Sequence, residues 1–392
     1  MHDASLTRAA RDARQGGPAA LAEALAASRA DTLARFAACE RALPGLAVPL
    51  RAELNPPLWE LGHIGWFQEF WIARNPERGR GWRADPDAPR LAPLRADADA
   101  LYDSSRVPHD SRWQLPLPDA AATRDDLERQ LARTLALLGE AGRVNGDSDD
   151  ALYFFRLALL HEDMHHEAAL YMARGLGLAV DDARWQPRAL PEPPPELAFD
   201  AGPWRLGSAA GAGFAFDNEL PAHEVALPAC RIDAQALRWA EYLPFVEATG
   251  QAAPRHLRCD GGRWQQWLHG GWQALDLGLA ACHLTRDEAL AWCCWAGRRL
   301  PTEAEWERAA CTRPEAFRWG DVWEWTASPF APFDGFLPHP YRDYSAPWFD
   351  GRPVLRGASH CTQPRLRHPR YRNFFPATRS DVPAGFRSCA NG

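Results

Sequence analysis

Three histidines stand within six residues of an apolar stretch, and this cluster constrains the fold more than any other feature of the chain. His161 and His165 are four residues apart, so on a helix both imidazoles lie on one face, one turn apart. Two imidazoles placed in this way can bind one metal ion. The flanking residues are apolar-rich and free of proline, which favours one long helix over 147–175. The sequence therefore predicts a metal site inside a helical region.

The run His161-Glu162-x-x-His165 also matches the motif of zinc peptidases, in which the glutamate acts as a general base. The extended form of that motif requires glycine at position 168 and histidine at position 171. This chain has Ala168 and Tyr171 instead. A zinc peptidase with a glutamate further along the chain as third ligand stays an alternative, as does a non-catalytic metal-binding module.

A third candidate ligand lies upstream, in a segment that opens with two prolines. His63 follows among aromatic residues, and the Pro-Pro start favours a helix over 54–75. Beside a helix that carries a histidine pair, His63 is the best candidate for a further nitrogen ligand. Three neutral imidazoles leave positions open on an octahedral ion, which suits oxygen chemistry at non-haem iron.

The composition argues against several classes of protein. The chain has 392 residues, enough for two domains, and its net charge of −7 argues against a nucleic-acid-binding protein. No run of about 20 apolar residues exists, so no transmembrane helix is expected. The N-terminus lacks the basic and apolar blocks of a secretory signal, and the nine cysteines include no CxxC pair. We therefore expect a cytoplasmic protein without disulfide bonds, which binds neither nucleic acid nor membranes.

Residues 5 to about 180 show the periodicity of amphipathic helices. Four long helices joined by one longer connection favour a helical bundle, in which inward side chains of facing helices build metal sites. This arrangement would bring His63 to the pair formed by His161 and His165. The predicted helices are 19–43, 54–75, 124–138 and 147–175.

Composition changes after a proline-rich stretch at 186–197, which we expect to be an extended, semi-rigid linker. Beyond it, glycine, tryptophan and short apolar stretches dominate. Two helices are predicted there, over 285–295 and over 302–310, and the second begins with a capping box. We therefore predict an α+β chain with a helical domain at 1–185 and a second domain at 198–392.

Four motifs beyond the linker resemble the hallmarks of the formylglycine-generating-enzyme (sulfatase-modifying factor) fold, a C-type-lectin-like domain. They stand in the family's order, although the second has aspartate where asparagine is usual. The resemblance implies that the second domain adopts this fold. The motifs are GRRLPTEAEWE (297–307), GDVWEWT (320–326), LRGAS (355–359) and GFR (385–387).

The N-terminal part resembles the DinB-like four-helix bundle, including its His…HxxxHxE metal pattern. A DinB-like bundle fused to a formylglycine-generating-type domain resembles the EgtB-type synthases of ergothioneine biosynthesis and their selenoneine-forming branch. The resemblance implies an iron(II)- and O2-dependent enzyme that joins sulfur or selenium to C2 of the imidazole of hercynine, which is Nα-trimethylhistidine. It also implies that the iron ligands are His63, His161 and His165.

The same resemblance implies a substrate pocket bordered by the C-terminal domain. Asn373 and Phe374 occupy positions that contact trimethylhistidine in relatives, and Arg379 matches an arginine linked to the carboxylate of the thiol substrate. Relatives use a tyrosine as a proton donor during bond formation. Tyr341 and Tyr344 are the candidates for that role in this chain.

A trimethylammonium group needs a site without hydrogen-bond donors, and aromatic faces attract it by cation–π interaction. The carboxylate of hercynine needs an amide or a guanidinium group, which Asn373 or an arginine of the nearby group would supply. The arginines of that group are Arg365, Arg367, Arg370 and Arg372. The candidate aromatic residues are Trp66, Phe67, Phe374 and Phe375.

Three departures from the family pattern bear on the donor. Relatives that use γ-glutamylcysteine carry aspartate at the position of Phe375, and many relatives have glutamine at that of Met164. Glu60 replaces the first histidine of the usual Trp-His-Leu-x-His start. We therefore predict a selenosugar donor, with cysteine or γ-glutamylcysteine as the alternative. We also expect His166 and Glu167 to support the ligating histidines.

Overall fold

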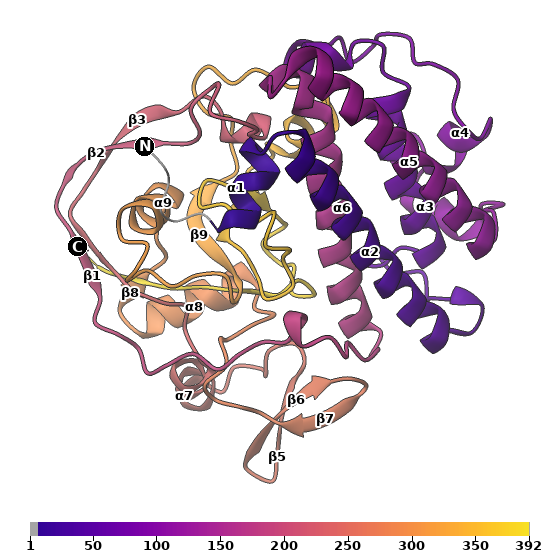
Figure 1. The fold of residues 1–392 in the computed structure, drawn as a ribbon. Coiled ribbons are helices and arrows are strands. Elements are labelled where there is room, and N and C mark those ends of the chain that lie inside the picture. The colour runs from indigo at the N-terminus through magenta and orange to yellow at the C-terminus, as the bar shows by residue number, and fades with distance from the viewer. Residues whose placement is uncertain (1–6, 392) are drawn as a thin grey trace.

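The computed structural model describes residues 7–391 and confirms the predicted α+β class. A helical N-terminal part lies side by side with a C-terminal part of short strands and helices (Figure 1). None of the described helices is long and apolar enough to cross a membrane. The N-terminal helices are α1 (Arg8–Gln15), α2 (Pro18–Ala42), α3 (Pro57–Gln68), α4 (Ala98–Tyr102), α5 (Ala120–Asn145) and α6 (Asp149–Gly175).

Helices α2, α3, α5 and α6 form the predicted bundle, and each packs against the other three. Helix α2 begins at Pro18, where the missing N–H costs no hydrogen bond, and the side chain of Asp119 caps α5. The helix predicted over 54–75 is shorter in the structure. It begins at Pro57 and passes into a π-helical turn, η2 (Glu69–Ala73).

Two connecting segments contain no long helix. Between α3 and α5 the chain forms α4 and two 3₁₀ turns, η3 (Arg78–Arg83) and η4 (His109–Gln114). The proline-rich stretch 186–196 has no helix or strand, yet it is tied to the C-terminal part, where Glu192 pairs with Arg238 at 2.8 Å. The domain boundaries inferred from composition stay a prediction.

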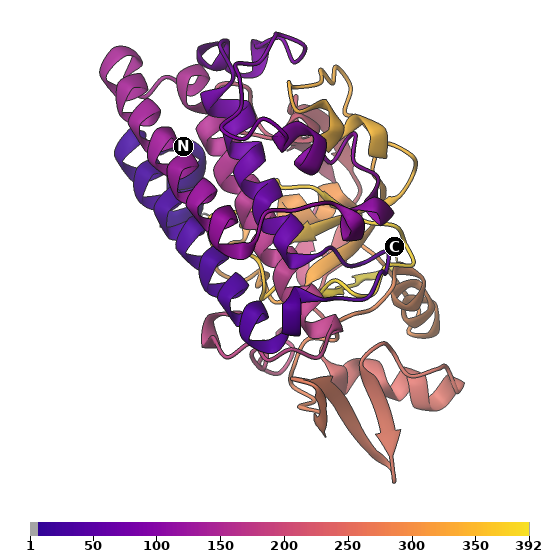
Figure 2. The same ribbon diagram turned by 90° about the vertical axis from the view of Figure 1, so that its right-hand side faces the viewer.

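The C-terminal part contains two four-stranded sheets. In one sheet β9 lies between antiparallel β10 and parallel β12, and β11 borders β10. The other sheet has the order β1-β4-β13-β8, so the first and last strands of this part share it. The antiparallel sheet of β5, β6 and β7 projects from the rest of the molecule (Figures 1 and 2). The strands are β1 (Leu197–Phe199), β2 (Gly202–Leu206), β3 (His223–Leu227), β4 (Cys230–Ile232), β5 (Leu257–Asp260), β6 (Arg263–Leu268), β7 (Gly271–Ala274), β8 (Arg298–Arg299), β9 (Trp323–Pro329), β10 (Pro353–Gly357), β11 (Asn373–Phe374), β12 (Ala384–Gly385) and β13 (Cys389–Ala390).

Helices α8 (Arg286–Trp295) and α9 (Glu303–Thr312) confirm the two helices predicted for this part. Each begins with a capping box, in which a threonine and the glutamate three residues later satisfy each other's backbone N–H groups. Helix α7 (Trp239–Thr249) is not predicted by the sequence pattern, because Pro244 stands inside it.

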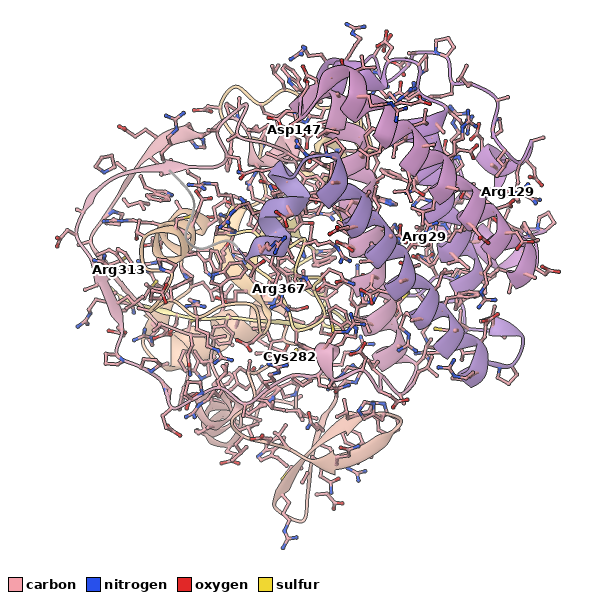
Figure 3. All side chains as sticks on the ribbon, viewed as in Figure 1. Arg29, Arg129, Asp147, Cys282, Arg313 and Arg367 are labelled. Atoms are coloured by element: carbon pink, nitrogen blue, oxygen red, sulfur yellow. The ribbon has the colours of Figure 1, made fainter. Side chains whose placement is uncertain are left out.

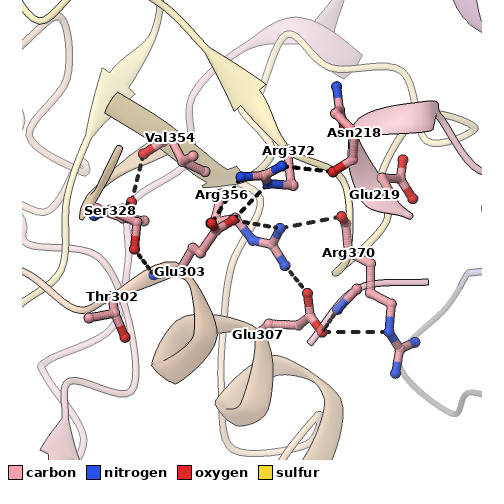
Figure 4. Close-up of polar contacts among 12 residues, drawn as sticks. Asn218, Glu219, Thr302, Glu303, Glu307, Ser328, Val354, Arg356, Arg370 and Arg372 are labelled. Carbon is pink, nitrogen blue, oxygen red and sulfur yellow. Dashed lines mark hydrogen bonds and ion pairs between the residues drawn. The ribbon is translucent and has the colours of Figure 1, made fainter. Parts of the chain in front are cut away.

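Buried ion pairs join the four motifs of the C-terminal part. Arg356 pairs with Glu307, and Arg387 pairs with Glu324. All four side chains are 0 or 1% exposed, and Figure 4 shows Arg356 beside Glu303 and Glu307 of α9. Trp306 adds a hydrogen bond of 2.8 Å from its indole N–H to Glu324. Residues from all four motifs therefore hold the strands and α9 together.

Helix α6 forms the face of the bundle that meets the C-terminal part. Near its end Glu167 accepts hydrogen bonds from Trp323 (2.7 Å), Ser359 (2.6 Å) and Thr362 (2.8 Å). Figure 2 looks onto the helical side and shows the bundle in front of the C-terminal strands. The helix that carries two of the three predicted ligands is therefore held from both parts of the molecule.

Candidate metal centre

The tertiary structure brings the three predicted ligands together. His63 comes from α3, and His161 and His165 come from successive turns of α6. One ring nitrogen of each lies within 4.8 Å of those of the others, and the Nε2 atoms of His161 and His165 are 3.2 Å apart. These are the residues that the spacing on the long helix and the upstream aromatic segment single out.

Hydrogen bonds orient two of the three rings. The Nδ1–H of His63 donates to the backbone oxygen of Tyr102 at 2.8 Å, which leaves Nε2 with a free lone pair. The Nδ1–H of His165 donates to Oε2 of Glu60 at 2.5 Å. His161 has no hydrogen-bond partner at Nδ1 among the described residues. Its ring instead stacks on Phe67, with centroids 3.5 Å apart and planes 3° apart.

Three imidazoles are ligands that suit a divalent transition metal, and the spacing of one pair fits such an ion. Two cis ligands with bonds of about 2.1 Å stand about 3.0 Å apart, close to the observed 3.2 Å between the Nε2 atoms of His161 and His165. Burial, the largest cause, lowers the pKa of His63 to about 3 and that of His161 well below its usual value. Both rings are therefore neutral and able to ligate. Three nitrogen donors leave further positions for substrate or oxygen.

Glu162, the general base of the zinc peptidase alternative, is held away from the histidines. Its carboxylate forms two hydrogen bonds with the guanidinium of Arg29 on α2, of 2.8 and 3.1 Å, and Figure 3 shows Arg29 within the bundle. The side chain of Glu162 is 1% exposed. A buried carboxylate that accepts two hydrogen bonds from a guanidinium group is poorly placed to activate water at the centre, which argues against the peptidase alternative.

The expectation that His166 and Glu167 support the ligands stays a prediction. One carboxylate oxygen of Glu167, Oε1, accepts hydrogen bonds from Trp323, Ser359 and Thr362 of the C-terminal part. His166 packs against the indole of Trp185, with ring centroids 4.8 Å apart. Both side chains are buried.

The carboxylate of Glu60 supports His165 through the hydrogen bond to Nδ1. Sequence reasoning missed this role, although the position of Glu60 three residues before His63 on one helix was a usable signal.

Two predicted aromatic residues back the histidine rings. Phe67 is 1% exposed and stacks on His161. Trp66 is 5% exposed, its ring lies 5.7 Å from that of His63, and its indole N–H donates to Asp99 at 2.7 Å. Both residues fix the positions of ligand rings, and contact with a substrate stays a prediction for each.

Tyr341 reaches the centre from the C-terminal part. Its ring lies edge-on to Phe67 at 4.9 Å and 6.2 Å from His161, and burial raises its pKa. Tyr344 is one step further away, with its ring 5.8 Å from that of Tyr341. Its hydroxyl shares a hydrogen bond of 2.7 Å with the hydroxyl of Tyr371. The structure therefore favours Tyr341 over Tyr344 as the tyrosine beside the histidines.

Asn373 and Phe374 form β11 and continue this row of aromatic rings. Phe374 lies 5.8 Å from Tyr344 and stacks on Phe330 at 4.1 Å. The amide oxygen of Asn373 accepts the backbone N–H of Phe374 at 2.9 Å. The row of rings from His161 through Tyr341 and Tyr344 to Phe374 links the two parts of the molecule.

Phe375 and Arg379 form a second contact with α6. The guanidinium of Arg379 lies 4.9 Å above the ring of Phe375 and 5.8 Å from that of Tyr171 on α6. Two hydrogen bonds to Asp381, of 2.7 and 2.9 Å, hold it there. One face of Phe375 therefore already carries a cation.

Arg372 does not bind a substrate carboxylate, and that prediction is wrong. Its side chain is 1% exposed and makes four hydrogen bonds, two of them to Glu303 at 2.8 and 3.0 Å. The other two reach the backbone oxygens of Asn218 and Ala331. Figure 4 shows Arg372 beside the Arg356–Glu307 pair. Its contacts are structural, because its donors are used inside the protein.

Comparisons with known proteins agree with the two-part structure. The sulfatase-modifying factor enzyme 1-like domain matches residues 182–321. The chain is 30% identical over 416 residues to a hercynine oxygenase of Mycolicibacterium smegmatis, with 85% of this chain and 90% of that protein covered. A hercynine oxygenase of Mycobacterium tuberculosis shows 30% identity over 399 residues, with the same two coverages of 85% and 90%. A formylglycine-generating enzyme of Streptomyces coelicolor is 30% identical over 158 residues, which cover 32% of this chain and 50% of that protein.

Proposed function

Because the chain belongs to the hercynine oxygenase family, we propose that it is an iron(II)- and O2-dependent enzyme that acts on hercynine. It forms a C–Se or C–S bond at C2 of the hercynine imidazole, and its preferred donor is a selenosugar. The observation that carries the proposal is the cluster of three histidine nitrogens within 4.8 Å of one another, with Tyr341 beside it.

His63, His161 and His165 would hold the iron. An iron(II) ion bound there supplies oxygen activation and lowers the pKa of a ligating thiol or selenol. The protein contributes the geometry. Phe67 fixes the plane of the His161 ring by stacking at 3.5 Å, and the hydrogen bond of 2.8 Å to the Tyr102 backbone fixes the ring of His63. Substrate and donor then meet in a fixed orientation, which lowers the barrier to bond formation.

Tyr341 is the proposed proton donor. Burial raises its pKa, so its Oη keeps its proton at neutral pH and would release it only to a strongly basic reacting group. Its ring is placed against Phe67 and His161. Tyr344 is the weaker candidate, since its hydroxyl already bonds that of Tyr371.

The choice of donor rests on Phe375. A phenyl ring cannot accept a hydrogen bond from the ammonium group of an amino-acid donor as a carboxylate would. The guanidinium of Arg379 lies over this ring and is held there by two hydrogen bonds to Asp381. A sugar-bearing donor without an ammonium group suits this surface better. The similarity to hercynine oxygenases favours the second candidate, a sulfoxide synthase that uses cysteine or γ-glutamylcysteine.

Anaerobic reconstitution with Fe(II) tests the proposal. Oxygen is then added with hercynine and one donor per tube: the selenosugar, cysteine or γ-glutamylcysteine. Mass spectrometry of the products is expected to show a selenium adduct with the selenosugar alone. A sulfoxide adduct with a thiol donor would overturn the choice of donor. No oxygen consumption with hercynine and any donor would favour a non-catalytic metal-binding module instead.

A further inference from the structure

Glu60 faces the histidine centre without being one of its ligands. It lies on α3, one turn before His63, and its side chain is buried, with 7% exposure. Its Oε2 accepts the Nδ1–H of His165 on α6 at 2.5 Å. The contact therefore joins the two helices that supply the three nitrogen donors.

The two edges of the His165 ring have different partners. Nδ1 faces Glu60, whereas Nε2 faces Nε2 of His161 at 3.2 Å. The two ring nitrogens of an imidazole point in different directions, so a metal ion at Nε2 cannot also bind the carboxylate at Nδ1. Glu60 therefore acts on the centre only through His165.

Further hydrogen bonds hold the carboxylate of Glu60 from behind. The amide N–H of Asn55 donates to Oε1 of Glu60 at 2.6 Å, and Arg112 donates to the amide oxygen of Asn55 at 2.9 Å. The guanidinium of Arg112 lies 3.8 Å from the ring centre of Trp59 on α3. This chain of hydrogen bonds runs from Arg112 through Asn55 and Glu60 to His165. Arg112 lies in η4, Asn55 lies just before α3, and Glu60 lies on α3.

We propose that Glu60 is a positioning residue that fixes His165 as the Nδ1–H tautomer with its Nε2 lone pair directed at the metal. Its negative charge makes the imidazole a stronger donor, and it offsets part of the positive charge that a divalent ion brings into a buried site. This role of Glu60 rests on one element of the proposed function, namely that the histidine centre binds a metal ion. It requires neither hercynine nor turnover.

Metal affinity separates the effects of charge and of shape. Fe(II) binding is measured anaerobically by competition with a chromophoric chelator, and the visible spectrum of the Co(II)-loaded protein reports ligand geometry. Glu60→Ala removes both effects and is expected to weaken Fe(II) binding about 10- to 100-fold and to change the Co(II) spectrum. Glu60→Gln keeps the shape without the charge, so we expect a smaller loss of affinity and a nearly unchanged spectrum.

Two further variants complete the test. Asn55→Ala loosens the support of Glu60, and we expect a loss of affinity smaller than that of Glu60→Ala. Glu128→Gln changes an exposed carboxylate on α5, and its affinity should equal that of the wild type. Thermal unfolding of each metal-free protein checks that the variants fold.

If both Glu60 variants bind Fe(II) with the affinity of the wild type, the proposal is overturned. The wild type could bind Fe(II) and make no product, while both Glu60 variants bind Fe(II) more weakly. That result would uphold the role of Glu60 and contradict the proposed function. Failure of the wild type to bind Fe(II) would overturn both.

Discussion

The histidine centre and the ionic network of the C-terminal part differ in how their polar groups are satisfied. In the network the charges of Arg356, Glu307 and Arg372 are buried and paired inside the protein. At the centre His63 and His165 each use Nδ1 for a hydrogen bond to a neighbouring oxygen, and Nε2 of His165 faces that of His161. Unused donor atoms that converge mark a binding site, whereas paired buried charges mark a structural one.

The motifs that most clearly signal the fold belong to the structural region. GRRLPTEAEWE, GDVWEWT, LRGAS and GFR each supply a side chain to buried ion pairs of the C-terminal part. The residues proposed for chemistry instead come from α3, from α6 and from the loop that carries Tyr341. A substitution at the histidine centre should therefore alter function and leave stability nearly intact. A substitution in the ionic network of the C-terminal part should lower stability and leave the chemistry of the centre unchanged.

The largest effect is expected for His161→Ala. The variant loses a nitrogen donor from the centre, so bound iron and product formation should both fall below detection. Its metal-free thermal stability should change little beyond the loss of the stacking contact with Phe67. Metal content by elemental analysis and product by mass spectrometry check this, with His223→Ala of β3 as the control. Full iron content in His161→Ala would contradict the proposed ligand set.

Arg356→Met should have the opposite pattern of effects to His161→Ala: it should lower the stability of the protein and leave iron binding unchanged. It leaves the carboxylate of Glu307 buried without its closest partner, which typically costs about 3–5 kcal/mol. Urea unfolding followed by circular dichroism measures the loss, and iron binding by the protein that remains folded should be unchanged. Arg8→Met, which breaks an exposed pair with Asp12, should leave stability unaltered. Equal stability of Arg356→Met and the wild type would erase the contrast between the two regions.

Tyr341→Phe should slow product formation about 100-fold or more, since it removes a proton donor and leaves the ring in place. Iron affinity should stay at the wild-type value. Tyr344→Phe serves as the matched control and should have a smaller effect, because that hydroxyl is bonded to Tyr371. Unchanged turnover in both variants would remove a tyrosine from the mechanism.

The smallest effect is expected for Phe375→Asp. A carboxylate at this position could bind the ammonium group of γ-glutamylcysteine, and one charged hydrogen bond is worth about 1.5–3 kcal/mol. We expect the ratio of kcat/KM for γ-glutamylcysteine over the selenosugar to rise about tenfold. Phe375→Leu, which removes the ring without adding charge, should leave this ratio close to that of the wild type. A ratio unaffected by Phe375→Asp would mean that Phe375 does not select the donor.

Local patterns in the sequence predicted much of the fold. The helical periodicity of 147–175 matches α6 at Asp149–Gly175, and the threonine–glutamate box at 302–305 marks the start of α9. Helical periodicity and capping depend on residues close together in the sequence, so they can be recognised without knowledge of the fold. Helix α7 was not predicted, because Pro244 interrupts the local helical pattern. Tertiary packing, which buries Trp239 and Tyr242, stabilises this helix.

The sequence by itself determined the long helices of the bundle, the order of the four motifs and the spacing that puts His161 and His165 on one face. Only the tertiary structure decided which polar residues are partners. Glu60 meets His165 across 105 positions, and Arg372 meets Glu303 across 69, so one supports the centre and the other the core. The physical reason is that helix periodicity and capping are short-range, whereas hydrogen bonding between buried groups depends on how distant segments pack.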